Sequence, residues 1–150
     1  RKMSERQWSD VLTVNLDGVF NTCRALIDGM TERGFGRIVN ISSVNGQTGQ
    51  FGQTNYSAAK AGMHGFTMAL AREVAKKGVT VNSVSPGYCE TALVMAVAEP
   101  VREQIIANIP VGRLGKPCEI ARVVDFLCAE DSAFITGANI PVNGGYFMDF

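Results

Sequence analysis

The sequence lacks a charge excess and a long apolar run, and each absence excludes a class of protein. The 150 residues include 14 basic and 14 acidic side chains, so the formal net charge is zero. Nucleic acids and anionic membranes usually select proteins with a basic excess, which is missing here. No apolar run approaches the roughly 18 residues that a membrane-spanning helix needs. We therefore expect no nucleic acid and no membrane among the partners.

Cysteine and histidine are also scarce. The four cysteines form no Cys-x-x-Cys pair, and His64 is the single histidine, so we expect no metal site. Scattered thiols of this kind are typical of reduced packing residues in a cytoplasmic protein. We expect His64 to pack on a helix face and to take no part in catalysis. The cysteines are Cys23, Cys89, Cys118 and Cys128.

The residues that are present suit one globular domain over 1–150, with 46% hydrophobic and 19% charged side chains. Ser4 and Gln7 form a capping-box pattern, and apolar residues then recur at helical spacing, which predicts a long helix over 5–33 that ends at Gly34. Asn15 interrupts the middle of this helix, where helix propensity would not select it. We expect a kink or a polar function at that point.

The rest of the chain alternates between strand and helix patterns. This order predicts an α/β fold with a parallel sheet, right-handed crossovers and helices on both faces. Pro141 cannot donate to a sheet ladder, so the last strand should lie at an edge. The predicted elements are strands over 37–43, 79–85 and 139–142, a loop over 44–55, helices over 56–77 and 117–129, and two short helices over 91–98 and 101–108 separated by Pro100.

The carboxyl ends of the predicted strands carry Ser, Pro and Gly. Open parallel sheets bind ligands beyond these ends, so the three strand ends predict one active-site rim. The residues concerned are Ser42 and Ser43, Pro86 and Gly87, and Gly144 and Gly145.

Tyr56 and Lys60 are four residues apart at the start of the second long helix, so they share one helix face. An ammonium beside a phenol stabilises the phenolate of a tyrosine, whose ordinary pKa is about 10. The phenol can then act as an acid or base near neutral pH. Ser43 precedes Tyr56 by thirteen residues, at a strand end, and its hydroxyl could hold a carbonyl oxygen beside the phenol. The alternative is a solvated helix start with Ser43 capping a loop.

Five motifs occur in the order of one known family, over essentially the whole chain. With them, the sequence resembles the short-chain dehydrogenase/reductase family. Within that family, the segments 45–56 and 85–88 are most similar to those of acetoacetyl-CoA reductases and next to those of 3-oxoacyl-[acyl-carrier-protein] reductases. The motifs are Asn15-Leu16, Asn40-Ile41-Ser42-Ser43, Tyr56-Ser57-Ala58-Ala59-Lys60, Pro86-Gly87 and Val142-Asn143-Gly144-Gly145.

The resemblance implies a role for each matched residue. Tyr56 would be the general acid that protonates a ketone while NAD(P)H delivers a hydride to the carbon. Lys60 would support the tyrosine and bind the nicotinamide ribose, Ser43 would polarise the carbonyl, and Asn15 would hold a water linked to Lys60. Pro86, Gly87 and Thr91 would border the cofactor. Gln50, Phe51, Gln53 and Tyr88 would line the acyl entrance, although residues 50–53 also suit a solvent-facing loop.

The resemblance also has gaps. The Gly-rich turn that meets the cofactor pyrophosphate in this family is absent, as is the Asn-Asn-Ala-Gly segment expected before the first helix. We therefore expect the C-terminal part of a Rossmann-like doubly wound domain, without its N-terminal βαβ units. Such a part would leave open sheet edges, and we expect the 150 residues alone to fold poorly and to be inactive.

The activity expected from the resemblance is the NAD(P)H-dependent reduction of a 3-oxoacyl thioester, first of all acetoacetyl-CoA. The expected cofactor is NADPH, with NADH as an alternative. The expected assembly is a homotetramer. Ala92 stands where carrier-protein reductases often have Asp, and the turn over 34–36 lacks an added basic residue, which favours coenzyme A over a carrier protein. A serine hydrolase would need a G-x-S-x-G motif and a phosphoryl-transfer enzyme a P-loop, and the sequence has neither. A non-catalytic member of the fold stays an alternative.

Overall fold

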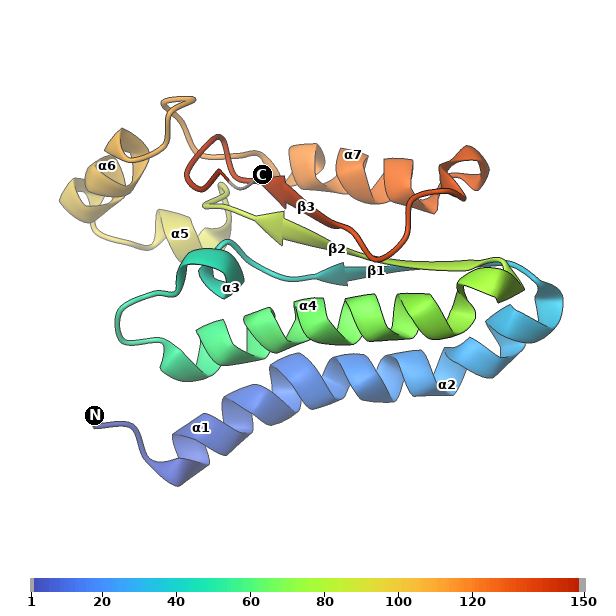
Figure 1. Ribbon diagram of the computed structural model, residues 1–150. Coiled ribbons are helices and arrows are strands. Elements are labelled where there is room, and N and C mark those ends of the chain that lie inside the picture. The colour runs from blue at the N-terminus through green and yellow to red at the C-terminus, as the bar shows by residue number, and fades with distance from the viewer. Residues whose placement is uncertain (1, 149–150) are drawn as a thin grey trace.

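The computed structural model describes residues 2–148 as a three-stranded parallel sheet with helices on both faces (Figure 1), which confirms the predicted α/β class. The strand order is β1-β2-β3, so β3, with Pro141, lies at one edge of this sheet. Gly36 pairs with Val79 in the first ladder, and Ser83 pairs with Asn139 in the second. The strands are β1 (Gly36–Ile41), β2 (Val79–Pro86) and β3 (Asn139–Val142).

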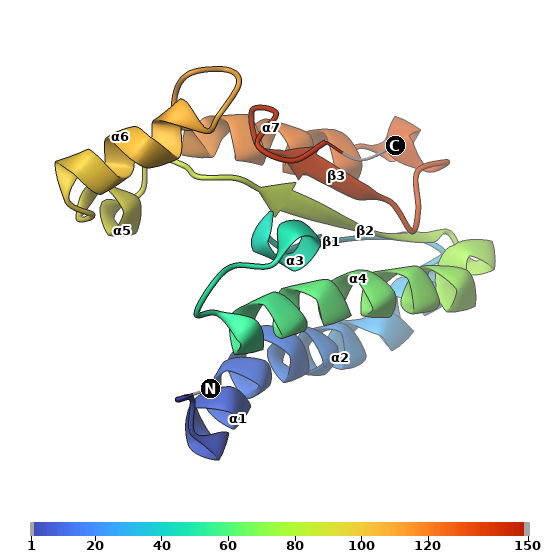
Figure 2. The ribbon, with the colours of Figure 1, turned by 60° about the vertical axis from the view of Figure 1, so that its left-hand side comes forward.

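The helices form two layers around the sheet. In both ribbon views, α2 and α4 lie on one side of the strands and α7 lies on the other (Figures 1 and 2). α5 and α6 lie at the end of the molecule toward which β2 runs (Figure 1). The helical elements are α1 (Glu5–Leu12), η1 (Thr13–Asp17), α2 (Gly18–Arg33), α3 (Asn45–Thr48), α4 (Thr54–Val74), η2 (Ala75–Lys77), α5 (Ala92–Met95), α6 (Glu99–Ala107), α7 (Pro117–Cys128) and η3 (Glu130–Ser132).

The predicted long helix is present, with a π-helical segment in its middle. Ser4 and Gln7 form both bonds of the capping box at its start, and Gly34 ends it in the left-handed conformation. The π segment η1 contains Asn15, as expected for an interruption of the regular hydrogen-bond ladder. Opposite η1, a side chain at Gly62 of α4 would approach Leu16 within 3.1 Å. The small residues of α4 therefore let the two long helices pack closely.

Three local predictions were wrong. The first strand ends at Ile41 and not at residue 43, because the chain turns there and the Oγ of Ser43 accepts a hydrogen bond from the amide of Asn45. That turn starts the short helix α3 inside the predicted loop over 44–55. Pro100 does not separate two helices but lies in the first turn of α6, where its missing N–H costs nothing.

The apolar core lies between the sheet and the long helices. β2 is the central strand, and all of its residues from Val79 to Ser85 are buried. Ala71 and Val74 of α4 pack against Val79 and Val81, and partly buried side chains of α2 and β1 surround them. This core fixes β2 and α4 relative to each other, so the first turns of α4 stand beside the carboxyl ends of the strands.

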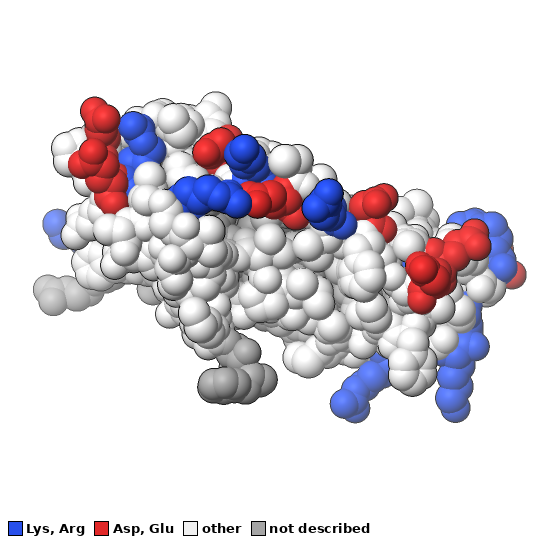
Figure 3. Space-filling model, turned by 90° about the horizontal axis from the view of Figure 1, so that it is seen from above, with Lys and Arg blue, Asp and Glu red and all other residues white. Residues whose placement is uncertain are grey.

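The face that carries α7 shows lysine, arginine and acidic side chains intermixed along its length (Figure 3). This distribution agrees with the zero net charge of the sequence. Among the described residues, no helix combines the length and the apolar character needed to cross a membrane. All four cysteines are free thiols.

Candidate active site

A cavity of about 1000 Å³ opens at the carboxyl ends of β1 and β2. Its walls come from the turn after β1, the first turns of α4, the segment that follows β2, α5 and α7. Seven of the predicted site residues line it, although they come from three separate segments of the chain. They are Ser43, Tyr56, Lys60, Pro86, Gly87, Tyr88 and Thr91.

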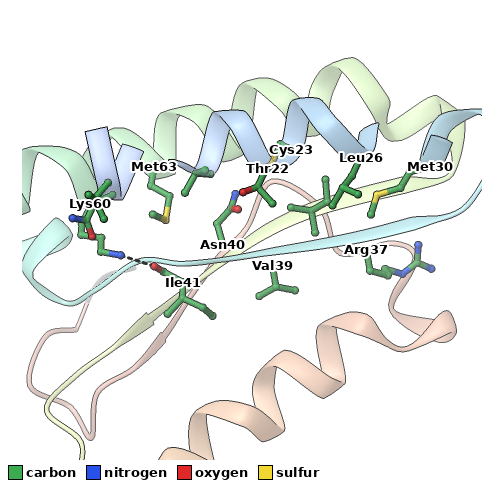
Figure 4. A pocket seen from close by; sticks show the side chains of 14 residues that line it. Thr22, Cys23, Leu26, Met30, Arg37, Val39, Asn40, Ile41, Lys60 and Met63 are labelled. Carbon is green, nitrogen blue, oxygen red and sulfur yellow. Dashed lines mark hydrogen bonds between the residues drawn. The ribbon is translucent and has the colours of Figure 1, made fainter. Parts of the chain in front are cut away.

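Tyr56 and Lys60 lie one helical turn apart on α4 and face the cavity together, as their spacing predicts. The ammonium nitrogen Nζ of Lys60 is 5.6 Å from the ring centre of Tyr56. It also donates a 2.8 Å hydrogen bond to the carbonyl oxygen of Ile41 at the end of β1 (Figure 4). Burial lowers the pKa of Lys60, because desolvation disfavours its charged form. The ammonium is thus bonded to a backbone acceptor and lies near the ring of Tyr56.

Ser43 lies two residues beyond β1 on the same wall. Its hydroxyl oxygen accepts a 3.1 Å hydrogen bond from the amide of Asn45, which fixes the serine at the start of the turn. The hydroxyl proton stays available for an acceptor in the cavity. The alternative in which Ser43 caps the loop is therefore compatible with a role at the cavity.

Asn15 does not line the main cavity. It lies on a second pocket, of about 370 Å³. The wall of this pocket also includes Lys60 (Figure 4). The side-chain amide of Asn15 donates a 3.0 Å hydrogen bond to the carbonyl oxygen of Val11, one turn earlier in the helix. Asn15 and Lys60 thus share this second pocket, and Lys60 lines the main cavity as well.

The segment after β2 forms the opposite wall. Gly87 has room for no side chain, because a Cβ there would lie 2.8 Å from the Cα of Asn143. Thr91 caps α5, and its hydroxyl accepts a hydrogen bond from the amide of Val94. Tyr88 stacks edge-on against Tyr146 at 5.5 Å, and burial together with this neighbour raises the pKa of Tyr88. Tyr88 therefore stays protonated at neutral pH.

Three predicted site residues do not reach the cavity. Gln50, Phe51 and Gln53 lie in the turn between α3 and α4, outside the set of lining residues. Phe51 is fully exposed, and the side-chain oxygen of Gln53 accepts a hydrogen bond from Asn45. In this conformation the segment is a solvent-facing loop, so its role at the acyl entrance stays a prediction.

Part of the wall was not predicted. Leu93 and Val94 of α5 and five side chains of α7 make this side of the cavity mainly apolar. The sequence predicted a helix over 117–129, but a predicted helix does not show whether it faces a ligand. The apolar α7 residues are Pro117, Ile120, Ala121, Val124 and Cys128, and Asp125 also lines the cavity.

Several known proteins are similar to this chain in sequence. A family model described as Enoyl-(Acyl carrier protein) reductase matches residues 1–147. The chain is 62% identical to an acetoacetyl-CoA reductase of Allochromatium vinosum and 60% identical to one of Cupriavidus necator, over 99% of this chain and 60% of each relative. It is 48% identical to the 3-oxoacyl-[acyl-carrier-protein] reductase FabG of Pseudomonas aeruginosa, over 98% of this chain and 60% of that protein. The chain thus spans about 60% of the length of these relatives.

Proposed function

The chain belongs to the short-chain dehydrogenase/reductase family, and we propose that the full-length protein is an NADPH-dependent reductase of 3-oxoacyl thioesters. The observation that carries this proposal is the common cavity wall of Ser43, Tyr56 and Lys60. A phenol, an ammonium and a hydroxyl around one open space can bind and protonate a carbonyl oxygen. The proposed substrate is acetoacetyl-CoA, and the product is 3-hydroxybutyryl-CoA.

The proposed reaction uses four residues, which are Ser43, Tyr56, Lys60 and Asn15. The hydroxyl of Ser43 donates a hydrogen bond to the ketone oxygen, and Tyr56 transfers its proton to that oxygen as the carbon is reduced. The ammonium of Lys60 stabilises the resulting phenolate, because the two groups face the same cavity. Asn15, which lines a second pocket together with Lys60, holds a water through which the site regains a proton.

The residues of this cavity suit the nicotinamide end of a cofactor, which supplies the hydride when it is bound. A flat ring needs a wall without projecting side chains, and Gly87 lines the cavity with backbone atoms alone. Pro86 and Thr91 border the same space, and Lys60 offers a donor to a ribose hydroxyl. We propose NADPH, with NADH as the alternative.

The proposed acyl group is short and joined to coenzyme A. The apolar side chains of α5 and α7 suit a small acyl chain, and Tyr88 closes the wall beside them. Ala92 and the turn over 34–36 add no charge that would select a carrier protein. Gln50, Phe51 and Gln53 would contact the acyl thioester only after a movement of their loop. Reduction of a 3-oxoacyl carrier-protein thioester is the second candidate, supported by the similarity to FabG.

We propose a homotetramer as the assembly. α2 and α4 carry a shallow groove of about 290 Å³, and its wall includes Phe20, Ile27, Phe66 and Leu70. A second copy of the chain would cover this apolar surface, since oligomers of identical chains use self-complementary faces. Sedimentation velocity of the full-length protein tests this proposal.

The decisive experiment measures NADPH oxidation by the full-length protein with acetoacetyl-CoA and with a carrier-protein thioester. We expect turnover of acetoacetyl-CoA, and we expect Tyr56→Phe to reduce kcat by about 10²–10⁴-fold, because that substitution removes the proton donor. Near-wild-type rates in Tyr56→Phe would exclude Tyr56 as the acid. A titration with NADPH separates an enzyme from a non-catalytic member of the fold, which would bind no nucleotide.

A further inference from the structure

His64 follows Tyr56 and Lys60 on the same face of α4, one more turn along the helix. It does more than pack on a helix face, because both ring nitrogens have hydroxyl partners. Nε2 lies 3.0 Å from the Oγ of Ser42, and Nδ1 lies 3.3 Å from the Oγ of Ser83. The imidazole therefore joins the end of β1 to the middle of β2.

The remaining bonds determine which ring nitrogen carries the proton. The single hydroxyl proton of Ser42 is donated to the carbonyl oxygen of Lys60 at 2.9 Å. Ser42 can then only accept from His64, so Nε2 carries the hydrogen. In the neutral ring Nδ1 is then an acceptor that faces the hydroxyl of Ser83 at 3.3 Å, and the same hydroxyl also faces the side-chain oxygen of Asn139 at 3.0 Å.

The surroundings favour the neutral ring. The pocket beside His64, of about 320 Å³, is lined by polar and apolar side chains of α3, α4, β2 and β3, and none of its lining residues is acidic or basic except His64 itself. Lys60, on α4, is the charged group on the other side, and its ammonium is directed to Ile41. Burial lowers the pKa of His64, because desolvation disfavours its charged form.

This network acts on the proposed catalytic residues through Ser42. The amide of Ser42 donates to the carbonyl oxygen of Val84 at 2.7 Å, and its hydroxyl binds the backbone of Lys60. The next residue is Ser43, and the residue before it, Ile41, accepts the bond from the Lys60 ammonium. The segment 41–43 and Lys60 are thus joined by two hydrogen bonds, and His64 supports one of them.

We propose that His64 is a positioning residue that, through Ser42, holds the hydroxyl of Ser43 and the ammonium of Lys60 at their relative positions. The proposal rests on the proposed function, because the displacement of these groups would lower the rate of the proposed reduction. A shift of about 1 Å in a catalytic group lowers a rate by up to about 10²-fold.

The test compares two amides at position 64 in the full-length protein. The side-chain amide of Gln reaches the place of Nε2 and keeps the donor to Ser42, whereas that of Asn reaches only the place of Nδ1. We expect His64→Gln to keep kcat with acetoacetyl-CoA within about threefold of wild type, and His64→Asn and Ser42→Ala to lower it by about tenfold, with KM nearly unchanged.

A matched control and a spectroscopic measurement complete the test. Ser57→Ala removes a buried hydroxyl of α4 that has no hydrogen-bond partner among the described residues, and it should leave kcat unchanged. Nitrogen NMR of the imidazole, assigned by its loss in His64→Gln, should show the Nε2–H tautomer at pH 7. An Nδ1–H tautomer, or equal rates for His64→Asn and wild type, overturns the positioning role. A wild-type protein without turnover instead overturns the proposed function and the positioning role with it.

Discussion

Lys60 is the side chain on which most of the site geometry converges. Its ammonium binds the backbone of Ile41 and lies 5.6 Å from the ring centre of Tyr56, and its carbonyl oxygen accepts from Ser42. The sequence predicted the pairing with Tyr56, because residues four apart on a helix face the same way. The bonds to residues 41 and 42 depend on the packing of α4 against β1, which no local pattern specifies.

The first prediction concerns the charge of Lys60. Lys60→Met keeps a flexible stem and removes the ammonium, so we expect kcat for ketone reduction to fall by about 10²-fold. In the reverse direction, oxidation of 3-hydroxybutyryl-CoA should be slowed as well, because the same ammonium lies beside the phenol that must take up the proton. Steady-state rates in both directions measure this. The control is Lys76→Met, which removes an exposed lysine of η2 and should change neither rate.

At the scale of elements, a helix was predicted correctly where a local sequence pattern marks it, and was missed where no such pattern exists. α7 begins at Pro117 as predicted, because proline is favoured in the first turn of a helix. α3 was missed, because its four residues, Asn45–Thr48, form no periodic pattern and are held by turn hydrogen bonds. The π segment η1 was foreseen only as an interruption at Asn15, since its type depends on the neighbouring α4.

The second prediction concerns the turn before β2. Gly78 has a φ of +74°, and a Cβ there would collide with the carbonyl oxygen of Gly34 at the end of α2. We expect Gly78→Ala to destabilise the protein by about 1–3 kcal/mol, from backbone strain and from the displaced α2 terminus. The control is Gly112→Ala, where φ is +77° and no atom lies within 4 Å. Urea unfolding of both variants should show the larger loss for Gly78→Ala, and equal losses would contradict a contact between these two turns.

The third prediction concerns the start of α7. Arg113 binds both carboxylate oxygens of Glu119, at 2.7 and 2.8 Å, and the amide of Lys116 donates to the same carboxylate. These bonds hold the pKa of Glu119 at about 2, from an ordinary value of 4.5. Because the pKa is lowered on folding, the contribution to stability is complete above pH 4.5 and is lost as the pH falls toward 2.

Arg113→Gln should therefore raise the pKa of Glu119 toward its ordinary value and flatten the pH dependence of urea unfolding between pH 2 and 4.5. Carbon NMR of the Glu119 carboxyl follows the titration directly. Arg6→Gln is the matched control, because Arg6 pairs with Asp10 at 3.6 Å on an exposed face of α1. An unchanged titration of Glu119 in Arg113→Gln would show that the amide of Lys116 sets its pKa alone.

At the scale of the whole molecule, the site results from the direction of the strands. β1 and β2 are parallel, so the residues after both strands meet at one end of the sheet. This rule was sufficient to predict that Ser43 and Gly87 line one cavity, but Gly144 and Gly145, predicted at the same rim, are not among its lining residues. It did not predict the contribution of α7, which depends on how a helix packs across the sheet, nor that the loop with Phe51 would lie outside the cavity.

The last prediction concerns the chain of 150 residues by itself. Within residues 2–148, β1 pairs only with β2, so its other edge presents unpaired backbone groups, and Ile41 at its end is exposed. Open strand edges pair with other chains, and we expect the isolated chain to aggregate and to oxidise no NADPH. Ile41→Lys places a charge at this edge and should increase the monomer fraction in size-exclusion chromatography. Phe134→Lys, at a fully exposed position after η3, should have a smaller effect. A monomeric, active wild-type chain would contradict the view that the edge of β1 needs a partner.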